Sequence, residues 1–319
     1  MRFKGNDMKR QRVDLTKIKT IPLNARKCKV SIQNFAKPGK KGASFKEFYN
    51  SLPDVLASQN LRFLVDKIVN AYNGDKMVIL MMGAHVIKCG LSPLVIDLMK
   101  RGVIKAVALN GAGIIHDTEI AMIGRTSEDV GEGILDGSFG MAKETASFIN
   151  GAINKGFQKG IGIGEALGGE IVKTKKPHRD LSILANGYEL GVPVTVHVAI
   201  GTDIIHQHPS ANGEAIGEGS LLDFRNFIYS VGSLDNGVAV NFGSAVILPE
   251  VFLKALTVAR NLGYKANIFT TANFDMISQY RPYQNILSRP TSSGGKGYNI
   301  IGHHEIMFPL LYRSIIEKI

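Results

Sequence analysis

Short apolar runs that end in glycine, asparagine or a small hydroxyl residue recur along this chain, and they limit its fold more than any other feature. Met77–Met82 leads into Gly83, and Ile104–Leu109 leads into Asn110. Runs of this length and composition are typical of strands buried on both faces of a parallel sheet. Between them, Ser92–Lys100 has a serine and a proline where a helix would begin. The three segments therefore predict a βαβ unit.

The alternation of helices and strands continues toward the C-terminus. A helical region is predicted at Ser44–Tyr72, before the βαβ unit. The segments predicted after the unit are a helix near Ser138–Gln158, a glycine-rich link at Gly160–Gly169, a strand at Val192–Ile200, a helix at Ser220–Tyr229, a strand at Gly237–Asn241, a helix at Pro249–Asn261, a strand at Lys265–Thr270 and a helix at Glu305–Lys318. Strands separated by helices pair in parallel through right-handed crossovers. We therefore expect an open, doubly wound, mainly parallel α/β sheet of the Rossmann type, with helices on both faces.

The net charge of +11 is concentrated at one end of the chain of 319 residues. Residues 1–46 contain 14 Lys/Arg and 2 Asp/Glu, and the remainder contains 24 basic and 25 acidic residues. We expect a basic N-terminal arm over 1–46 and a single α/β nucleotide-binding domain over 47–319. A solvated arm explains the charge more simply than nucleic-acid binding does, although contact with polyanions or an acidic neighbouring subunit is the alternative.

Cysteine content and hydropathy indicate the compartment. Cys28 and Cys89 are the two cysteines, and neither lies in a CxxC pair, which argues against a zinc-cysteine site or a disulfide framework. The first residues carry scattered charges rather than a signal-length apolar stretch, and no segment reaches the ~20 apolar residues that span a bilayer. A cytoplasmic protein without membrane contact is the expectation.

Ligands of open α/β sheets bind beyond the carboxyl ends of the strands. In this sequence the predicted strand ends are rich in Gly, Asn, Ser and Thr, which offer backbone N–H groups and small hydroxyls to phosphate or ribose. A nucleotide-type ligand is therefore predicted there. The candidate cofactor-binding residues at these ends are Gly83, Asn110, Gly111, Gly113, Gly243, Ser244, Thr271 and Ala272.

Three ionisable residues follow the asparagine-glycine loop. His116, Asp117 and Glu119 would lie near the start of a helix, where carboxylates are favoured by the helix dipole. One interpretation makes the two carboxylates helix caps. The other makes one of the three a proton carrier or an amine-binding group beside the ligand.

A second group of polar residues contains Asp203 and His206. Histidine titrates near neutrality, so general acid or base chemistry is the main hypothesis for His206. Metal ligation by His206 and His208 lacks a complete ligand set, and His303-His304-Glu305 lacks the HExxH spacing. No metal is expected, and a metal-assisted hydrolase that uses these two clusters stays an alternative.

The strand-end segments resemble those of deoxyhypusine synthase over residues 77 to 285. The similar stretches, which keep the order of the family, are Met81–Gly83, Cys89–Leu91, Asn110–Gly113 with Asp117, Gly201–His206 and Thr270–Asp275. The resemblance implies an NAD cofactor, with Asp275 near it, an active-site histidine at His206 and a homotetramer. Residues Ile114–Thr126 are also similar to archaeal ornithine-cyclising enzymes that share this fold and use NAD.

One departure from that family changes the expected reaction. Where the family has its imine-forming lysine, this sequence has Leu248, and leucine cannot form a Schiff base. Hypusine formation is therefore not expected. We expect an NAD-dependent transferase or lyase that acts on a C–N bond of a polyamine, amine or amino acid, in which His206 relays a proton and Asp117, Glu119 or Asp203 attracts the cationic substrate. A non-catalytic nucleotide- or polyamine-binding subunit is the alternative.

Overall fold

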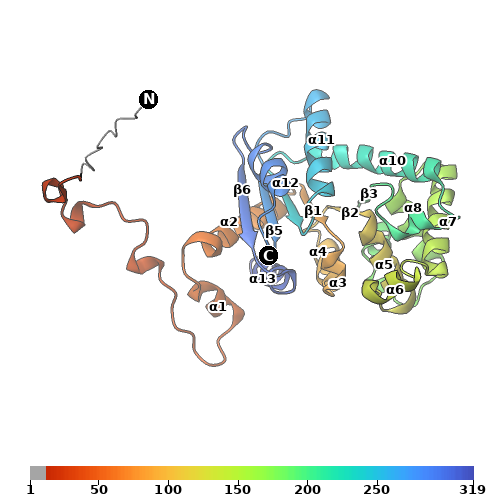
Figure 1. Ribbon diagram of the computed structural model, residues 1–319, viewed down its shortest axis with the longest axis horizontal. Coiled ribbons are helices and arrows are strands. Elements are labelled where there is room, and N and C mark those ends of the chain that lie inside the picture. Colours follow the sequence, from red (N-terminus) through yellow and green to blue (C-terminus); the bar gives the residue numbers. More distant parts are fainter. Residues whose placement is uncertain (1–11) are drawn as a thin grey trace, which may run out of the picture.

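Six parallel strands form the centre of the molecule in the computed structural model, which describes residues 12–319 (Figure 1). The strands are β1 (Val78–Met82), β2 (Ala106–Asn110), β3 (Val194–His197), β4 (Val238–Phe242), β5 (Thr270–Asp275) and β6 (Lys296–Ile301). Their order across the sheet is β3-β2-β1-β4-β5-β6, and every neighbouring pair runs parallel. The predicted doubly wound parallel sheet is confirmed.

Helices connect the strands and pack around them. They are α1 (Phe45–Ser51), α2 (Leu56–Asn73), α3 (His85–Lys88), α4 (Ser92–Lys100), α5 (Gly111–Ile123), α6 (Val130–Asp136), α7 (Lys143–Lys159), α8 (Ile163–Lys173), α9 (Ile183–Leu190), α10 (Gly213–Gly232), α11 (Ile247–Asn261), α12 (Tyr280–Pro282) and α13 (His304–Ile316). Short 3₁₀ turns occur at η1 (Leu15–Lys17), η2 (Leu23–Ala25), η3 (Ile32–Asn34), η4 (Arg179–Leu181) and η5 (Ile204–Gln207), and η6 (Tyr283–Ser288) is a π-helix. Within residues 12–319, no helix is long and apolar enough to cross a membrane.

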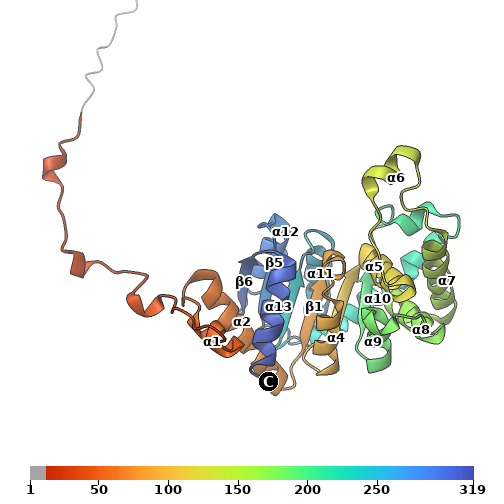
Figure 2. The same cartoon turned by 90° about the horizontal axis from the view of Figure 1, so that it is seen from below.

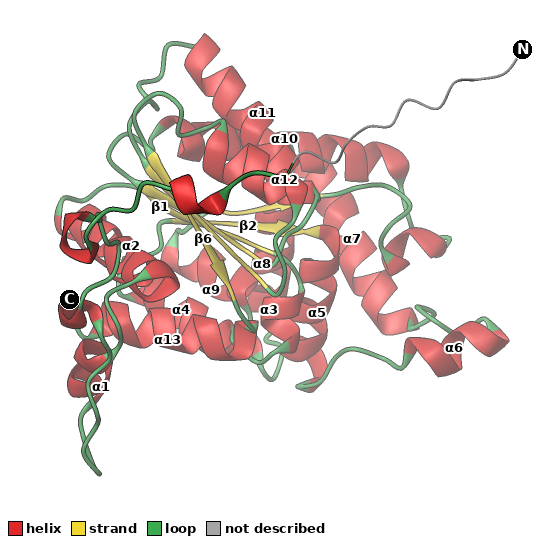
Figure 3. Ribbon diagram, turned by 60° about the vertical axis from the view of Figure 1, so that its left-hand side comes forward, coloured by secondary structure: helices red, strands yellow, loops and turns green. Residues whose placement is uncertain are grey.

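Both faces of the sheet are covered, and β1 shows how. All five of its side chains are buried. Val78, Leu80 and Met82 belong to a core shared with α2, α4 and α13, whereas Ile79 and Met81 belong to a second core shared with α10, α11 and η6. Successive side chains of a strand point to opposite faces, so this division places helices on both sides (Figures 2 and 3).

The chain order reverses between β1 and β4. The first half of the sheet is built outward from β1 through β2 to β3, and the chain then returns to β4 on the other side of β1. In a doubly wound sheet the loops after two such strands part in opposite directions, which leaves room for a ligand at the carboxyl ends. The functional site is therefore sought at this edge.

The described part of the N-terminal arm, which starts at residue 12, runs outside the α/β body (Figure 1). Residues 12–33 are exposed throughout. The first backbone bonds to the body join Lys37 N–H to Ser51 O, at 2.9 Å, and Asp54 N–H to Asn34 O, also at 2.9 Å. The predicted division between residues 46 and 47 falls within α1 and stays a prediction.

The predicted glycine-rich link at Gly160–Gly169 is wrong, because most of it lies in helix α8. Its glycines allow close packing instead of forming a loop. A Cβ atom on Gly164 would lie 1.7 Å from the carbonyl oxygen of Val194, and one on Gly168 would lie 2.5 Å from that of Leu184. The two glycines therefore let α8 approach β3 and α9 more closely than any larger residue could.

The predicted strand at Lys265–Thr270 is also wrong, because β5 begins where that segment ends. Thr271 and Ala272, predicted in a ligand-binding loop, are consequently inside the strand and completely buried. The reason is that β5 alternates polar with apolar residues although both of its faces are covered. A buried strand was expected to be continuously apolar, and this one is not. The unpredicted strand β6 pairs with β5.

Candidate functional site

Two glycines at the reversal of chain order bring the ends of β1 and β4 together. The backbone N–H of Gly83 donates to the carbonyl of Phe242 at 3.0 Å. A Cβ atom on Gly83 would lie 2.4 Å from the carbonyl oxygen of Gly243. Gly243 itself has φ +70°, a conformation that favours glycine. The predicted cofactor residues Gly83 and Gly243 are thus brought together, and part of their role is to allow this close approach.

Two long helices, α11 and α13, begin beside these glycines, and the residue just before each of them provides no side-chain cap. The side chains of Val246, before α11, and His303, before α13, accept no hydrogen bond from their helices. Ser244 uses its hydroxyl to accept from the Leu248 amide at 3.2 Å. Among residues 12–319, no partner accepts from the backbone amides of Ser244, Ala245 or Val246. Free amides at a helix N-terminus attract anions such as phosphate.

His304 faces the same glycine from α13. A Cβ atom on Gly243 would lie 2.5 Å from Cε1 of its ring. The ring lies 5.2 Å from that of Phe242 and 5.6 Å from that of His85, centroid to centroid. His304 is 3% exposed, and burial lowers its pKa. Among residues 12–319, neither ring nitrogen has a hydrogen-bond partner, which is unusual for buried polar atoms.

At the end of β2, a carboxylate lies against the N-terminus of α5. The Asn110 side chain caps α5 by accepting from the Gly113 amide at 3.0 Å. A Cβ atom on Gly111 would lie 1.8 Å from Oδ2 of Asp203, so only glycine leaves space for that carboxylate. The predicted cofactor residues Asn110, Gly111 and Gly113 therefore hold α5 and Asp203 in place.

Asp203 has an unsatisfied oxygen. Its side chain is 7% exposed, and Oδ2 has no hydrogen-bond partner among the described residues. Burial raises the pKa of this carboxyl to about 6. An ionised carboxylate in such a place is stabilised by a cation, so Asp203 suits the ammonium group of a substrate.

His206 lies next to this carboxylate in η5. Its Nδ1 accepts from the backbone amides of Gly201, at 3.1 Å, and Asp203, at 3.3 Å. The proton of the neutral ring is therefore assigned to Nε2, which is buried without a partner. Burial lowers the pKa of His206. His206 is thus arranged to donate a hydrogen bond rather than to accept a proton.

His206 and His208 serve different partners. Nε2 of His208 lies 2.8 Å from the carbonyl oxygen of Gly140, far along the chain from the amides that His206 binds. Within residues 12–319, no group of three or more His, Cys, Asp or Glu side chains could hold a metal ion. The described residues therefore provide no set of ligands for the metal-assisted hydrolase that the sequence left as an alternative.

Asp117 caps a helix, and the hypothesis that it contacts the substrate is corrected. The residue is completely buried, and burial raises its pKa to about 6. Its oxygens accept from the Ser182 hydroxyl at 2.5 Å, the Ile183 amide at 2.7 Å and the Leu184 amide at 3.2 Å. The helix that it caps is α9, whereas the sequence suggested the helix containing Asp117. No free approach to a ligand remains.

His116 and Glu119 lie further along α5 and share a threonine. His116 Nδ1 lies 2.7 Å from the Thr126 hydroxyl, which also bonds to Glu119. The hydroxyl of Thr145 donates to the other oxygen of Glu119 at 3.0 Å. A cavity of about 450 Å³ adjoins this network and is lined by Glu119, Thr126 and Thr145. The sequence singled out His116 and Glu119, but it gave no role to either threonine.

The remaining predicted cofactor residues lie on β5 at different depths. Asp275 ends the strand, is 8% exposed, and accepts from the Met276 amide at 2.8 Å. Thr271 is four residues earlier, roughly 13 Å away at the rise of a strand. Thr271 and Ala272 therefore belong to the interior of the sheet, and their predicted contact with a cofactor is withdrawn.

A row of asparagines crosses the carboxyl halves of three strands. Asn241 donates to Asn273 at 2.7 Å, and Asn273 donates to Asn299 at 3.1 Å. Oδ1 of Asn241 is buried and has no partner in the part of the chain that the structure describes. The sequence showed these asparagines, but their lateral alignment depends on strand register and could not be seen before β5 and β6 were placed.

Unsatisfied buried atoms concentrate at this edge. Of eleven such side-chain atoms among the described residues, five belong to Asp203, His206, Asn241 and His304. A cavity of about 310 Å³ also opens at this end, between β3, α10 and α11, with walls that include His197, Phe224 and Val251. Apolar walls with a few polar groups are typical of small-molecule sites.

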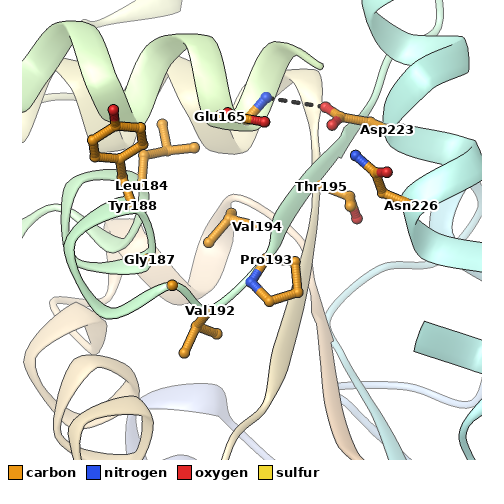
Figure 4. Close-up of a pocket in the computed structure, with 12 residues that line it drawn as sticks. Glu165, Leu184, Gly187, Tyr188, Val192, Pro193, Val194, Thr195, Asp223 and Asn226 are labelled. Carbon is orange, nitrogen blue, oxygen red and sulfur yellow. Dashed lines mark hydrogen bonds between the residues drawn. The ribbon is translucent and has the colours of Figure 1, made fainter. Parts of the chain in front are cut away.

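Another cavity, of about 260 Å³, lies at the opposite end of β3 (Figure 4). Asp223 reaches toward it from α10, and Oδ2 accepts from the amides of Gly164 at 3.0 Å and Val196 at 2.9 Å. Burial raises the pKa of Asp223 to about 7. Because these bonds join α8 and α10 to the edge strand, we interpret this aspartate as structural.

Comparison with known proteins places this architecture. No family model and no curated protein matches the sequence. A solved structure of a protein assigned to the deoxyhypusine synthases from Entamoeba histolytica superimposes with a TM-score of 0.52 and 12% identity, over 88% of this chain and 96% of that one. The chain has a deoxyhypusine synthase-like fold.

Two further structures share that fold. A conserved LOR/SDH protein from Methanococcus maripaludis S2 gives a TM-score of 0.50 at 15% identity, over 82% of this chain and 70% of that one. AgrE in a ternary complex with ornithine and NAD⁺ gives a TM-score of 0.52 at 13% sequence identity, over 82% of this chain. The chain spans only 34% of the length of AgrE.

Proposed function

We propose that this protein is an NAD-binding enzyme that removes hydride from a nitrogen-bearing carbon of a small cationic amine or amino acid. Asp203 carries the proposal, because its buried and unpartnered Oδ2 requires a cationic partner when the carboxyl is ionised. The ornithine and NAD⁺ bound by AgrE, a protein of the same fold, support this ligand class. A homotetramer and a cytoplasmic location stay predictions.

The residues at the reversal of chain order fit NAD⁺. The starts of α11 and α13 offer positive dipole ends to a pyrophosphate, and Gly243 leaves the backbone open to close approach. His304 would satisfy one unpartnered ring nitrogen against a phosphate or ribose oxygen. When bound, NAD⁺ supplies the hydride acceptor.

The chain's own groups then hold the substrate. Asp203 binds the ammonium group, whose charge persists when the amine is oxidised to an iminium ion. His206 donates from Nε2, which fixes the orientation of a substrate oxygen or nitrogen. The predicted proton relay by His206 is thereby revised, because its Nδ1 already accepts from two backbone amides.

A lysine imine has no place in this proposal. Leu248, at the position of the expected lysine, lies in the first turn of α11 and is completely buried in the core. Lys254 is paired with Glu250 on the exposed side of the same helix. We therefore favour direct hydride removal over aminobutyl transfer through an enzyme imine, and hypusine formation is not proposed.

Thermal unfolding and absorbance test this function. The full chain should unfold at higher temperature with NAD⁺, and NADH absorbance should appear with one member of a panel of diamines and diamino acids. His304→Phe should lose the NAD⁺ effect, whereas Asp203→Asn should keep that effect and lose turnover. Absence of any NAD⁺ shift would contradict the proposal. A shift without turnover by any substrate would favour the alternative of a non-catalytic binding subunit.

A further inference from the structure

Helix α6 lies outside the hydrophobic core, and none of its residues is buried. Figure 2 shows it standing away from α5, α7 and the rest of the body. Its large apolar side chains are open to solvent: Val130 is 48%, Ile134 66% and Leu135 86% exposed. A helix of seven residues is unstable in water by itself, so burial of these side chains against another surface would stabilise it.

The segment that contains α6 is acidic and is held in shape by local hydrogen bonds. Asp129 caps the helix, and Glu128 accepts from the Gly140 amide at 3.0 Å. Residues 126–142 contain four acidic residues and no Lys or Arg. In the part of the chain from residue 12 onward, none of the four forms an ion pair. This surface therefore combines exposed apolar side chains with uncompensated negative charge.

The N-terminal arm has the complementary composition. Residues 12–35 contain six Lys/Arg and one Asp. Eight large apolar side chains of this stretch are between 54% and 85% exposed, and they are Val13, Leu15, Ile18, Ile21, Leu23, Val30, Ile32 and Phe35. Neither a solvated tail nor a polyanion-binding tail needs large apolar side chains. The arm therefore suits a protein surface that is both apolar and acidic.

The arm and α6 lie at opposite ends of one molecule (Figures 1 and 2). The arm leaves the body beside α1 and α2, and α2 packs against the edge strand β6. Helix α6 lies beyond the other half of the sheet, which ends at β3. In a single copy the arm extends away from α6 and neither surface covers the other. If each arm reaches the α6 of a second copy, the same contact forms twice and the pair is closed.

We propose that the N-terminal arm of one copy docks on residues 126–142, which include α6, of a second copy of this chain. The apolar residues of the arm cover Ile134 and Leu135, and its Lys and Arg side chains offset the negative charge of the segment. The cavity of about 450 Å³ beside this segment, with Ile123 and Glu128 in its wall, gives an arm side chain room to be buried. The contact requires neither NAD⁺ nor substrate.

Cross-linking between two versions of the full chain tests the contact directly. The native Cys28 lies in the arm and is exposed. The double variant Leu135→Cys, Cys28→Ser has a thiol on α6 and none in its arm. When it is co-expressed with the unmodified chain and treated with a short bis-maleimide, a covalent dimer should form. Mass spectrometry should find the Cys28 peptide joined to the α6 peptide, a product that can form only between two copies.

Leu262→Cys, Cys28→Ser is the matched control, because Leu262 is also an exposed leucine but follows α11, outside residues 126–142. It should give only background cross-linking to Cys28. Glu132→Lys places a positive charge opposite the basic arm. It should raise the concentration at which half of the chains are paired about tenfold, as sedimentation measures.

Equal cross-linking of the Leu135→Cys and Leu262→Cys chains would overturn the proposal, and so would products that join Cys28 only to Cys28. A chain that sediments as a monomer at every concentration and binds RNA through its arm would overturn it in favour of a polyanion. Leu135 is not buried, so the variant should fold, and Ile134→Cys repeats the test if it does not.

Discussion

Asp117 and Asp203 are two buried aspartates on the same side of the sheet, and they differ in one respect. Burial raises the pKa of each carboxyl to about 6. Asp117 accepts three hydrogen bonds at the start of α9, whereas Oδ2 of Asp203 accepts none. A perturbed pKa therefore does not separate a structural carboxylate from a functional one in this protein. The separation comes from whether the protein satisfies the oxygen atoms itself.

Among the variants that test this difference, Asp117→Ala should have the largest effect, and the quantity that it changes is the free energy of unfolding. Asp117→Ala removes the acceptor from three buried donors and should lower the free energy of unfolding by about 3 kcal/mol. Chemical denaturation of the variant and the parent measures the difference. Asp129→Ala is the matched control, because Asp129 caps α6 through the amides of Gly131 and Glu132 at the surface. It should cost about 1 kcal/mol or less. Equal losses would contradict the structural role of Asp117.

Asp203→Asn should have the opposite profile. The free energy of unfolding should stay constant or rise, because the variant no longer buries an ionised carboxylate whose Oδ2 lacks a partner. Affinity for the cationic substrate should fall about 30-fold, which corresponds to about 2 kcal/mol for the loss of a charge-assisted contact. Calorimetric titration with the substrate identified in the absorbance panel measures it. Unchanged affinity would show that Asp203 does not bind the substrate.

The pH dependence of substrate binding sharpens the same point. A cation prefers the ionised carboxylate, so affinity should be constant above pH 7 and fall as pH drops through the pKa of Asp203, about 6. Well below that value the fall should approach tenfold per pH unit. Calorimetry at several pH values gives the profile, and Asp203→Asn should flatten it. Affinity that rises toward acid pH would contradict the pairing.

In the ligand-free protein, we expect Asp203 to have a smaller effect, on the pH dependence of the free energy of unfolding. The folded-state pKa of Asp203 lies above the ordinary value of 3.8, so the folded state binds the proton more tightly than the unfolded chain. Its contribution to stability is complete below pH 3.8 and is lost as pH rises through 6. Asp203→Asn should therefore reduce the loss of stability between pH 4 and pH 7 by about 1 kcal/mol, after allowance for screening by solvent.

The sequence predicted the architecture where apolar pattern and element length agreed. The strands β1, β2 and β4 and the helices α4 and α11 were placed to within about two residues. β5 was misplaced, because Thr271 and Asn273 face a covered side of the sheet and imitate a loop in composition. Buried polar strands depend on lateral partners such as Asn241 and Asn299, which a local pattern does not contain.

The candidate site was predicted in part for a similar reason. Strand-end glycines and Asp203 follow from the rule that ligands bind at carboxyl ends. The contact between Asp203 and Gly111, and that between His304 and Gly243, join segments far apart in the sequence. No spacing shows them. The role of Asp117 was missed because its partners, Ser182 to Leu184, belong to a helix that is distant in the sequence.

A crystal structure of the full chain soaked with NAD⁺ and the diamine most active in the absorbance panel is the most direct test. We expect the dinucleotide to lie against Gly243 and His304, at the starts of α11 and α13, with an ammonium group within hydrogen-bond distance of Asp203 Oδ2. NAD⁺ bound instead in the cavity beside Asp223, or an unoccupied edge with Asp203 still unpartnered, would contradict it.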